Sequence, residues 1–303
     1  MGKRKILILG GTGMLGHVLF RSLSKNEDFA VHATTRDYKG LARYFDLKLK
    51  EKIRPQIVEA DNFDSVIRSL ASIQPDIVIN CIGLIKQLPL AGDPLSAITI
   101  NAQLPHRLSL ICRTSHARLI HISTDCVFNG RKGMYVESDM SDAEDLYGRT
   151  KYLGEVSYRP HCITLRTSII GHELKGKLGL VEWFLAQEEK VNGFTKAIYS
   201  GFPTIELSRV ISEYVIPNTD LSGVYHVSSE PISKYDLLKL VANRYNKNVK
   251  IEPFLDFVQD RSLDSSLFKK QTGYGPPAWS ELIDMMYSDY IQNKGIYDEK
   301  GVS

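Results

Sequence analysis

Apolar residues along the first two thirds of the chain follow two patterns that alternate with each other. Short apolar runs, as in residues 5–9 and 76–81, are typical of strands buried on both faces of a parallel sheet. Between such runs, apolar residues recur every three or four positions, which indicates amphipathic helices. The alternation predicts an α/β fold, a doubly wound parallel sheet with helices on both faces. The expected strands are 5–9, 29–34, 56–60, 76–81, 118–123 and 162–166, and the expected helices are 13–24, 62–73, 94–114 and the segment that carries Tyr147 and Lys151.

Beyond Gly171 the alternation loosens, which predicts a smaller C-terminal lobe that faces the substrate. We expect a dinucleotide-binding core with the catalytic residues over 1–170 and a lobe over 171–292, with some segments returning to the core. Residues 293–303 are expected to form a polar, frayed tail. The expected helices of the lobe are 180–189, 207–216, 234–245 and 280–292, and its clearest strand is 223–227.

Composition narrows the classes of function. A formal net charge of +3 over 303 residues gives no support to nucleic-acid binding. The basic stretch 48–54 contains Glu51 and is interpreted as a solvated helix end. The cysteines are widely spaced and the histidines form no HxxxH or HExxH arrangement, so no metal site is expected. We expect a cytoplasmic protein with reduced thiols, because no signal-peptide stretch or membrane span is visible.

A glycine-rich turn follows the first expected strand. Gly10, Gly13 and Gly16 are spaced as GxxGxxG, and Thr12, Met14 and Leu15 fill the turn between them. Such a turn between a strand and a helix brings backbone N–H groups close to a pyrophosphate at the helix N-terminus. The position of the turn at the start of the chain favours a dinucleotide cofactor.

The end of the second strand normally reads the ribose next to adenine. Arg36 follows two threonine hydroxyls there and favours NADPH, because arginine accommodates a 2′-phosphate, while NADH stays open. The alternative is that Arg36 is only a surface charge. Asp61, followed by Asn62, is placed to meet the adenine, although it would serve equally well as a helix N-cap. At the end of the fourth strand, Cys81, Ile82 and Gly83 are expected beside the cofactor.

Three residues downstream describe a site for hydride transfer. Tyr147 and Lys151 are four positions apart, so both side chains lie on one face of a helix. A neighbouring ammonium makes a phenol more acidic, and an acidic phenol can protonate a carbonyl oxygen while a nicotinamide delivers hydride. Thr124, at the end of the fifth strand, is placed to hold the carbonyl against Tyr147. An exposed helical pair is the alternative for Tyr147 and Lys151, but the preceding Ser123-Thr124 argues against it.

At this point the chain resembles a known family. The similarity is to extended short-chain dehydrogenases, and within them to the dTDP-4-dehydrorhamnose reductase family. The resemblance implies a doubly wound sheet with a smaller substrate lobe, and reduction of the 4-keto group of a nucleotide-linked 6-deoxyhexose. The motifs that carry it are Ile122-Ser123-Thr124-Asp125-Cys126-Val127-Phe128, Tyr135-x-Glu137, Tyr147-Gly148-Arg149-Thr150-Lys151-x-x-Gly154-Glu155, Ile100-Asn101-Ala102, Leu165-Arg166-Thr167-Ser168 and Arg261-Ser262-Leu263-Asp264-Ser265.

The resemblance also implies roles for individual residues. Thr124, Tyr147 and Lys151 match the catalytic positions, Asn101 lies on the cofactor side, and Arg261 matches a position where a guanidinium could pair with a diphosphate. The residues expected on the substrate side are Thr124, Asp125, Cys126, Phe128, Ser168 and Arg261. A homodimer is compatible with the sequence, and a diphosphate substrate could recruit magnesium without a protein metal site.

Three departures from the family pattern bear on the sugar. Cys126 and Ile169 replace the usual tyrosine and tryptophan near the sugar, and Ser262 replaces a common proline. They favour a related deoxysugar over dTDP-rhamnose itself, with an N-acetylated or UDP-linked sugar as candidates.

Other functions on this fold remain as alternatives. A 4,6-dehydratase would need an acid–base pair after the threonine, and Cys126 cannot supply its second member. A 4-epimerase would use the same Tyr147 and Lys151 with a tightly held NAD, whereas Arg36 favours a cofactor that exchanges. A non-catalytic subunit is expected to lose the tyrosine or the lysine, and both are present.

Overall fold

The computed structural model describes residues 2–36, 53–57 and 62–298. Its centre is a seven-stranded parallel sheet in the order β10-β6-β5-β4-β1-β2-β3. The chain builds outward from β1 in one direction and from β4 in the other, so a crevice opens where the two strands' carboxyl ends meet. The strands are β1 (Arg4–Leu9), β2 (Phe29–Thr35), β3 (Ile53–Ile57), β4 (Ile77–Asn80), β5 (Arg118–Ile122), β6 (Cys162–Arg166) and β10 (Gly223–His226).

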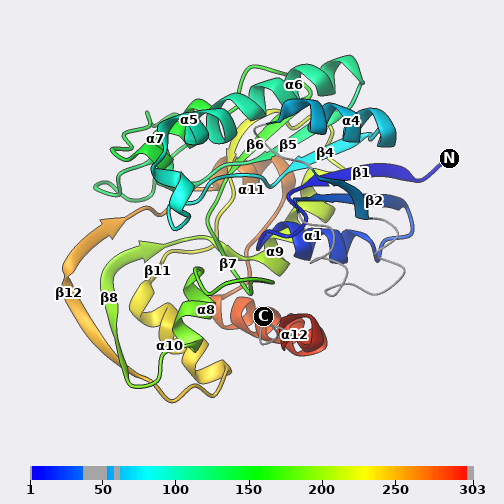
Figure 1. Ribbon diagram of the computed structural model, residues 1–303. Helices are drawn as coiled ribbons and strands as arrows, with labels where there is room; N and C mark the ends of the chain where they lie inside the picture. The colour runs from blue at the N-terminus through cyan, green and yellow to red at the C-terminus, as the bar shows by residue number, and fades with distance from the viewer. Residues whose placement is uncertain (1, 37–52, 58–61, 299–303) are drawn as a thin grey trace.

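Helices cover both faces of this sheet, as Figure 1 shows. Alternate residues of β1 point to opposite faces: Leu7 and Leu9 pack with α4 (Phe63–Ile73) and α6 (Leu104–Thr114). Ile6 and Ile8 belong to the core on the other side, which contains α1 (Gly16–Leu23), α9 (Thr204–Val210) with its π-helical continuation (Ile211–Val215), and α12 (Trp279–Gln292). The doubly wound α/β fold expected from the hydrophobic pattern is therefore confirmed.

The helix expected over 94–114 is not uniform. It begins as α5 (Pro94–Ala97) after a short 3-10 turn (Pro89–Gly92), continues as a π-helical segment, η2 (Ile98–Gln103), and ends as α6. π-Helical turns of this kind often occur at functional sites. Asn101 lies in this segment and is buried, so the irregularity coincides with a residue expected on the cofactor side.

The C-terminal lobe is built around a small second sheet, in the order β11-β8-β12 (Figure 1). Only short strands were expected here, but β8 and β12 run for ten and eleven residues. Much of β12 is exposed and lacks a regular alternation of buried and exposed positions, so hydrophobic patterning could not reveal it. The lobe contains β7 (Ile169–Ile170), α8 (Leu180–Leu185), β8 (Lys190–Tyr199), β9 (Phe202–Pro203), β11 (Ile232–Ser233), α10 (Lys234–Arg244), β12 (Lys250–Asp260) and α11 (Ser266–Thr272).

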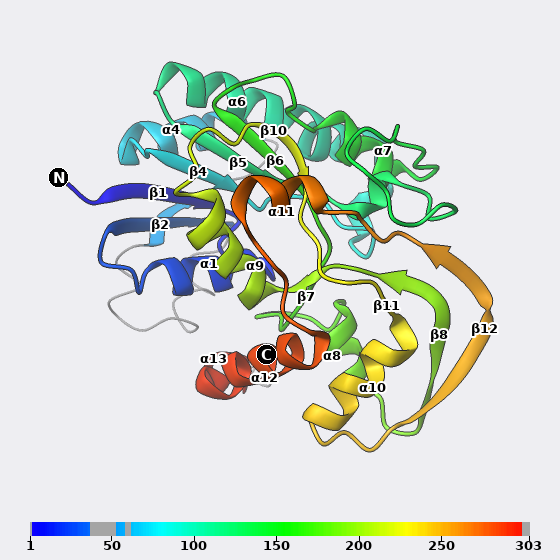
Figure 2. The ribbon, with the colours of Figure 1, turned by 180° about the vertical axis from the view of Figure 1, so that it is seen from behind.

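Part of the expected C-terminal tail is ordered. Lys294–Asp298 forms a further helix, α13, which lies with α12 below α1 and α9 in Figure 2. Tyr297 is 3% exposed, and its hydroxyl lies 3.0 Å from Nε2 of His17. The expectation of a frayed tail was therefore wrong for residues 294–298, because one aromatic side chain in a polar segment is enough to dock it.

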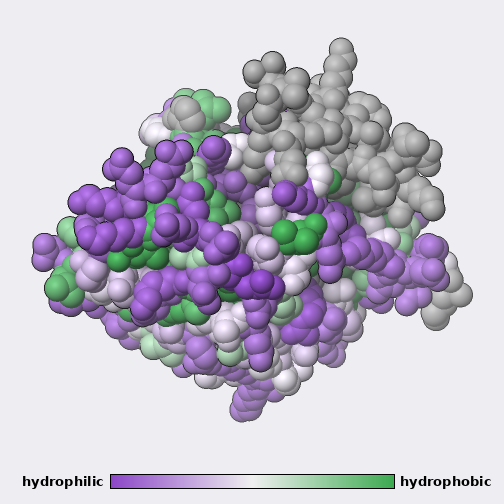
Figure 3. Space-filling model, turned by 90° about the horizontal axis from the view of Figure 1, so that it is seen from below, coloured by the Kyte–Doolittle hydropathy of each residue, from purple (hydrophilic) through white to green (hydrophobic). Residues whose placement is uncertain are grey.

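The surface seen in Figure 3 is mostly hydrophilic, with small separate groups of hydrophobic side chains. Within the described ranges, every helix is too short or too polar to cross a lipid bilayer. The same residues contain no cluster of three or more histidine, cysteine or acidic side chains suited to a metal ion.

Candidate active site

The glycine-rich turn joins β1 to α1, and its glycines serve different purposes. Gly10 has φ +83°, a conformation that favours glycine. A methyl group on Gly11 would lie 2.6 Å from Cβ of Ala33, and one on Gly16 would collide with the carbonyl of Gly10. Gly13 is exposed, and a methyl group there would make only an ordinary contact at 3.4 Å. The protein's own backbone and packing therefore require glycine at positions 10, 11 and 16, whereas the space beside Gly13 stays open for a ligand.

The side chains between these glycines differ in environment. Leu15 is 4% exposed in the core, so its side chain cannot contact a cofactor and only its backbone lies at the helix start. Met14 reaches Gly179, where an added methyl group would lie 2.5 Å from its Cε. Thr12 is half-buried in the turn. The expected role of Leu15 is thus limited to its main chain.

Arg36 is exposed directly after β2, at the edge where the glycine turn lies. The threonine hydroxyls before it were interpreted as part of the ribose site, but Thr34 and Thr35 are buried. The Gly10 N–H donates to the Thr34 hydroxyl at 3.2 Å, and the Gly11 N–H donates to the Thr34 carbonyl at 2.8 Å. Thr34 therefore holds the glycine turn, and Arg36 is the exposed residue at this end of β2.

Two further cofactor-side expectations fall at the start of α4. Asp61 lies outside the described residues. Asn62 is exposed at the N-cap, and its carbonyl, not its side chain, accepts hydrogen bonds from Ser65. Its amide side chain thus has no structural task in the cap.

At the end of β4, Cys81, Ile82 and Gly83 lead into a loop that Asn101 holds. The Asn101 amide accepts from Leu84 N–H at 2.9 Å and donates to the Leu84 carbonyl at 3.1 Å. Burial raises the pKa of Cys81 to about 12, so this thiol stays protonated. Asn101 is therefore placed to position the loop rather than to contact a cofactor itself.

The structure brings Thr124, Tyr147 and Lys151 together at the carboxyl end of β5. Tyr147 and Lys151 lie on α7 (Leu146–Leu153), and Thr124 precedes η3 (Asp125–Val127). The Thr124 hydroxyl lies close to Tyr147, accepts from the Cys126 N–H at 3.1 Å, and donates to Asp125 at 3.1 Å. Lys151 is 4% exposed, and its ammonium donates to the Ile122 carbonyl at 2.7 Å.

The electrostatics of Tyr147 differ from the expectation. Burial raises the pKa of its phenol well above the ordinary value, and Cys126, Asp125 and Asp145 add to the shift. Lys151 was expected to lower this pKa, but burial, the largest cause of the shift, raises it. Burial instead lowers the pKa of Lys151 to about 8, with Glu155 and Cys81 opposing the change.

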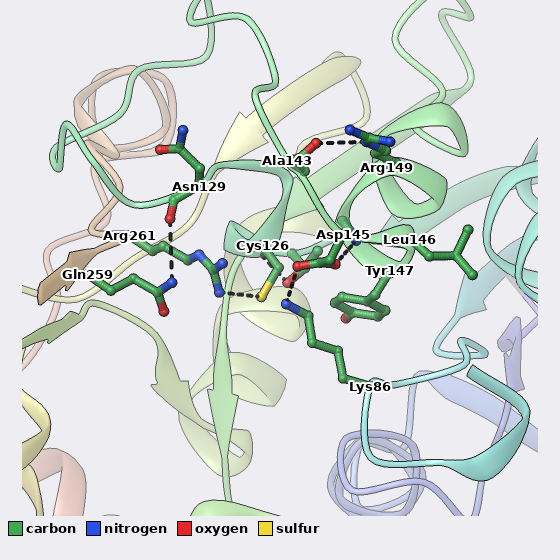
Figure 4. Close-up of polar contacts among 12 residues, drawn as sticks. Lys86, Cys126, Asn129, Ala143, Asp145, Leu146, Tyr147, Arg149, Gln259 and Arg261 are labelled. Atoms are coloured by element: carbon green, nitrogen blue, oxygen red, sulfur yellow. Dashed lines mark hydrogen bonds and ion pairs between the residues drawn. The ribbon is translucent and has the colours of Figure 1, made fainter. Parts of the chain in front are cut away.

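The start of α7 fixes Tyr147 in place. Asp145 is the N-cap, and its Oδ1 accepts from the Gly148 N–H at 2.8 Å. A methyl group on Gly148 would collide with the Cys126 carbonyl, so glycine lets α7 approach η3 closely. Figure 4 shows Tyr147, Asp145 and Cys126 gathered at this contact.

Basic side chains from separate segments surround Cys126. Arg261, which follows β12, donates from Nη1 to the Cys126 sulfur at 3.3 Å (Figure 4). Its Nε is buried without a hydrogen-bond partner among the described residues, which suits a guanidinium awaiting an anion. Burial raises the pKa of Asp125, whereas the charges of Arg261 and Lys234 lower it. Lys234 and Lys86 were not expected here, although each follows a strand of the structure.

Phe128 was expected to contact the substrate, but it is fully buried. Its ring stacks on Tyr135 at 4.1 Å between centroids, and the Arg166 guanidinium lies 5.2 Å from the ring centroid. Arg166 pairs with buried Glu155 at 2.7 Å, and Ser123 donates to the same carboxylate at 2.7 Å. Phe128 therefore supports the site from within, whereas Ser168 is half-buried and lies close to Tyr199.

Comparison with known proteins identifies the family of this chain. The family description "RmlD substrate binding domain" matches residues 4–291. The chain therefore belongs to this family, a branch of the extended short-chain dehydrogenases that contains dTDP-4-dehydrorhamnose reductases. The resemblance seen in the sequence motifs is thereby confirmed.

Individual relatives of the family carry two kinds of name. Methionine adenosyltransferase 2 subunit beta from Danio rerio is 26% identical over 255 residues, covering 80% of this chain and 74% of the relative. dTDP-4-dehydrorhamnose reductase from Aggregatibacter actinomycetemcomitans is 26% identical over 242 residues, covering 77% and 76%. The crystal structure of dTDP-4-dehydrorhamnose reductase from Bacillus anthracis with NADP is similar in fold, with TM-score 0.76, 21% identity and coverage of 95% and 99%.

Proposed function

We propose that the protein is an NAD(P)-dependent reductase that acts on the 4-keto group of a nucleotide-linked 6-deoxyhexose. The observation that carries this proposal is the grouping of Thr124, Tyr147 and Lys151 at the end of β5, beside the glycine turn. Membership of a family that contains sugar-nucleotide reductases supports it.

The residues present fit a dinucleotide. The open space beside Gly13 suits a pyrophosphate, since no side chain of the described residues fills it. Gly83 lies close to Lys151, because a methyl group added there would lie 4.0 Å from its Nζ. Exposed Arg36 favours NADPH over NADH. When bound, the nicotinamide supplies the hydride.

The chain's own residues then handle the proton. Thr124 and Tyr147 hold the keto oxygen, and Tyr147 donates its phenol proton to that oxygen as the C4–H bond forms. Lys151 binds the ribose hydroxyls and, together with them, returns a proton to Tyr147 after the reaction. For this, the Thr124 hydroxyl turns from Asp125 toward the substrate.

The substrate side favours an anionic, nucleotide-linked sugar other than the dTDP-rhamnose precursor. Arg261 and Lys234 supply positive charge for a diphosphate. Cys126 and Ile169 are smaller than the aromatic residues usual in rhamnose-forming members, so the pocket accepts a different substituent on the ring.

A non-catalytic binding subunit is the second candidate. It is favoured by the relatives named as a subunit of methionine adenosyltransferase, which match as strongly as the named reductases. Such a protein would bind a dinucleotide or sugar nucleotide without turnover.

One experiment separates the two candidates. The purified protein is mixed with NADPH and a panel of 4-keto-6-deoxy sugar nucleotides made by dehydratases, and absorbance of the reduced nicotinamide is followed. We expect oxidation with one member, and loss of turnover in Tyr147→Phe with NADPH affinity nearly unchanged. NADPH binding without oxidation by any member would instead favour the subunit, and turnover by Tyr147→Phe at the wild-type rate would refute the catalytic assignment.

A further inference from the structure

Lys86 lies over the ring of the proposed acid. Its ammonium is 5.6 Å from the centroid of the Tyr147 ring. The residue comes from the loop between β4 and the 3-10 turn at Pro89–Gly92, a segment far from α7 in the sequence. Figure 4 shows the Lys86 side chain reaching up beside Tyr147 toward Asp145 and Cys126.

A carboxylate fixes this ammonium relative to Tyr147. Lys86 Nζ donates to Asp145 Oδ2 at 2.6 Å, while the other oxygen of the same carboxylate caps α7 through Gly148. Lys86 is 38% exposed, so the ion pair alone adds little stability. Its geometric effect is larger, because one carboxylate sets both the start of α7 and the place of the ammonium.

The Lys151 ammonium donates to the Ile122 carbonyl at 2.7 Å. Lys86 places a second cation near Tyr147, with its ammonium 5.6 Å from the ring centroid. A cation over an aromatic ring is attracted by the electrons of its face, and it favours the phenolate over the phenol.

The other charged groups around Tyr147 are mostly unfavourable to a phenolate. Asp125 and Cys126 face it from η3, and Asp145 faces it from α7. On the basic side, Arg261 contacts Cys126, and Lys234 acts on Asp125 from the start of α10. Burial and the acidic groups raise the pKa of Tyr147, so a nearby cation would offset them by stabilising the phenolate.

We infer that Lys86 is a positioning residue that stabilises the Tyr147 phenolate as the tyrosine gives up its proton. The inference rests on the proposed reduction. In that step the phenol O–H bond breaks and its proton forms the new O–H bond at C4. Hydride from the reduced nicotinamide forms the C4–H bond, and the nicotinamide is left oxidised. The negative charge on Tyr147 is transient and lies within reach of the Lys86 ammonium.

The first test reads the phenol directly and needs no substrate. A fluorinated tyrosine, whose phenol is more acidic, is placed at position 147, and its ionisation is followed by fluorine NMR. We expect Lys86→Met to raise its pKa by roughly one unit, from the Coulomb energy of charges this close. Lys86→Arg should restore most of the shift. An unchanged pKa in Lys86→Met would overturn the inference.

The structure offers a matched control. The Lys132 ammonium also lies 5.6 Å from a tyrosine ring centroid, that of Tyr135, and pairs with Asp139. Lys132→Met should leave the pKa at position 147 unchanged. An equal shift in this variant would mean that the effect is a general loss of positive charge and would also overturn the inference.

Kinetics with the substrate found in the panel provide the second test. Lys86→Met should lower kcat about tenfold with KM changed less than about threefold, because only the charge that develops on Tyr147 loses a partner. A raised KM with unchanged kcat would make Lys86 a substrate-binding residue and contradict the inference. If the phenol pKa shifts as expected while no panel member is reduced, the proposed function fails and the electrostatic role of Lys86 stands.

Discussion

The two glycines at the start of α1 meet different demands, which single methyl groups can separate. Gly16 packs against the Gly10 carbonyl, whereas the space next to Gly13 is open. We expect Gly16→Ala to lower the free energy of unfolding by about 3 kcal/mol, since overpacking displaces the backbone. Gly13→Ala should change it by less than about 1 kcal/mol but weaken NADPH binding about tenfold or more. Urea unfolding measures the stability of the two variants, and fluorescence titration measures their NADPH affinity. An equal loss of stability in Gly13→Ala and Gly16→Ala would show that the fold also needs Gly13.

Arg36 is the residue on which cofactor choice depends. Its side chain is exposed after β2, while the neighbouring threonines are buried and hold the glycine turn. Arg36→Ala should raise the Kd of NADPH about tenfold or more and that of NADH by less than about threefold, because a charged hydrogen bond to the 2′-phosphate is lost. Titration of the variant with both dinucleotides checks this. An equal loss for both would identify Arg36 as a general surface charge.

Among the elements, the docked α13 contributes a contact to the cofactor turn. The His17 ring lies between the Gly13 carbonyl, 2.9 Å from Nδ1, and the Tyr297 hydroxyl, 3.0 Å from Nε2. Tyr297 is distant from His17 in sequence, whereas Gly13 lies four residues before it, in the turn where the pyrophosphate would bind.

Tyr297→Phe removes one hydrogen bond and keeps the ring. We expect the free energy of unfolding to fall by about 1–2 kcal/mol and NADPH affinity to fall about threefold to tenfold, since a buried imidazole nitrogen loses a partner next to Gly13. Tyr287→Phe on α12 is the control, because the Tyr287 ring packs against Tyr245. A loss of stability without any change in NADPH affinity would show that α13 only supports the fold.

The elements also show where hydrophobic patterning succeeds. Strands such as β1 and β4 are buried on both faces, so continuous apolar runs identified them. Residues 56–57 of the strand expected at 56–60 belong to β3 (Ile53–Ile57), at the edge of the sheet, and residues 58–60 lie outside the described part of the chain. In the π-helical segment η2, the Asn101 side chain hydrogen-bonds Leu84, a contact between residues 17 positions apart that helical spacing does not predict.

At the scale of the whole molecule, a buried histidine links stability to pH. Nδ1 of His226 donates to the Tyr135 carbonyl at 2.9 Å, and Nε2 accepts from Arg166 at 3.2 Å, so the ring is held neutral. Burial and the Arg166 charge lower the pKa of His226 to about 4. The unfolded chain binds this proton near pH 6.5, before the native state does, so stability is lost as the pH falls below about 6.5.

The expected loss can be isolated with one substitution. From neutral pH to pH 5, His226 should reduce the free energy of unfolding by about 2 kcal/mol, from the difference between its two pKa values. His226→Gln should be less stable at pH 7 but lose about 2 kcal/mol less than the wild type between pH 7 and pH 5. Urea unfolding at both pH values measures this. Parallel losses in the two proteins would place the pH dependence elsewhere.

The homodimer considered from the sequence stays a prediction, as does the boundary near residue 170 between the core and the substrate lobe. The structure shows chain segments crossing that boundary: β10, from the second half, pairs with β6 at the edge of the central sheet. These two strands are too far apart in the chain for a local sequence pattern to predict that they pair.

The sequence by itself determined the class of fold, the glycine turn and the pairing of Tyr147 with Lys151, because each depends on local spacing or on burial repeated along one element. Only the tertiary structure decided which neighbours these groups have. It turned Lys151 toward the Ile122 carbonyl, set Lys86 over Tyr147, buried Phe128 against Tyr135 and docked Tyr297 on His17. Electrostatics and hydrogen bonding act over a few ångströms in space, so contacts between distant segments are fixed only once the chain has packed.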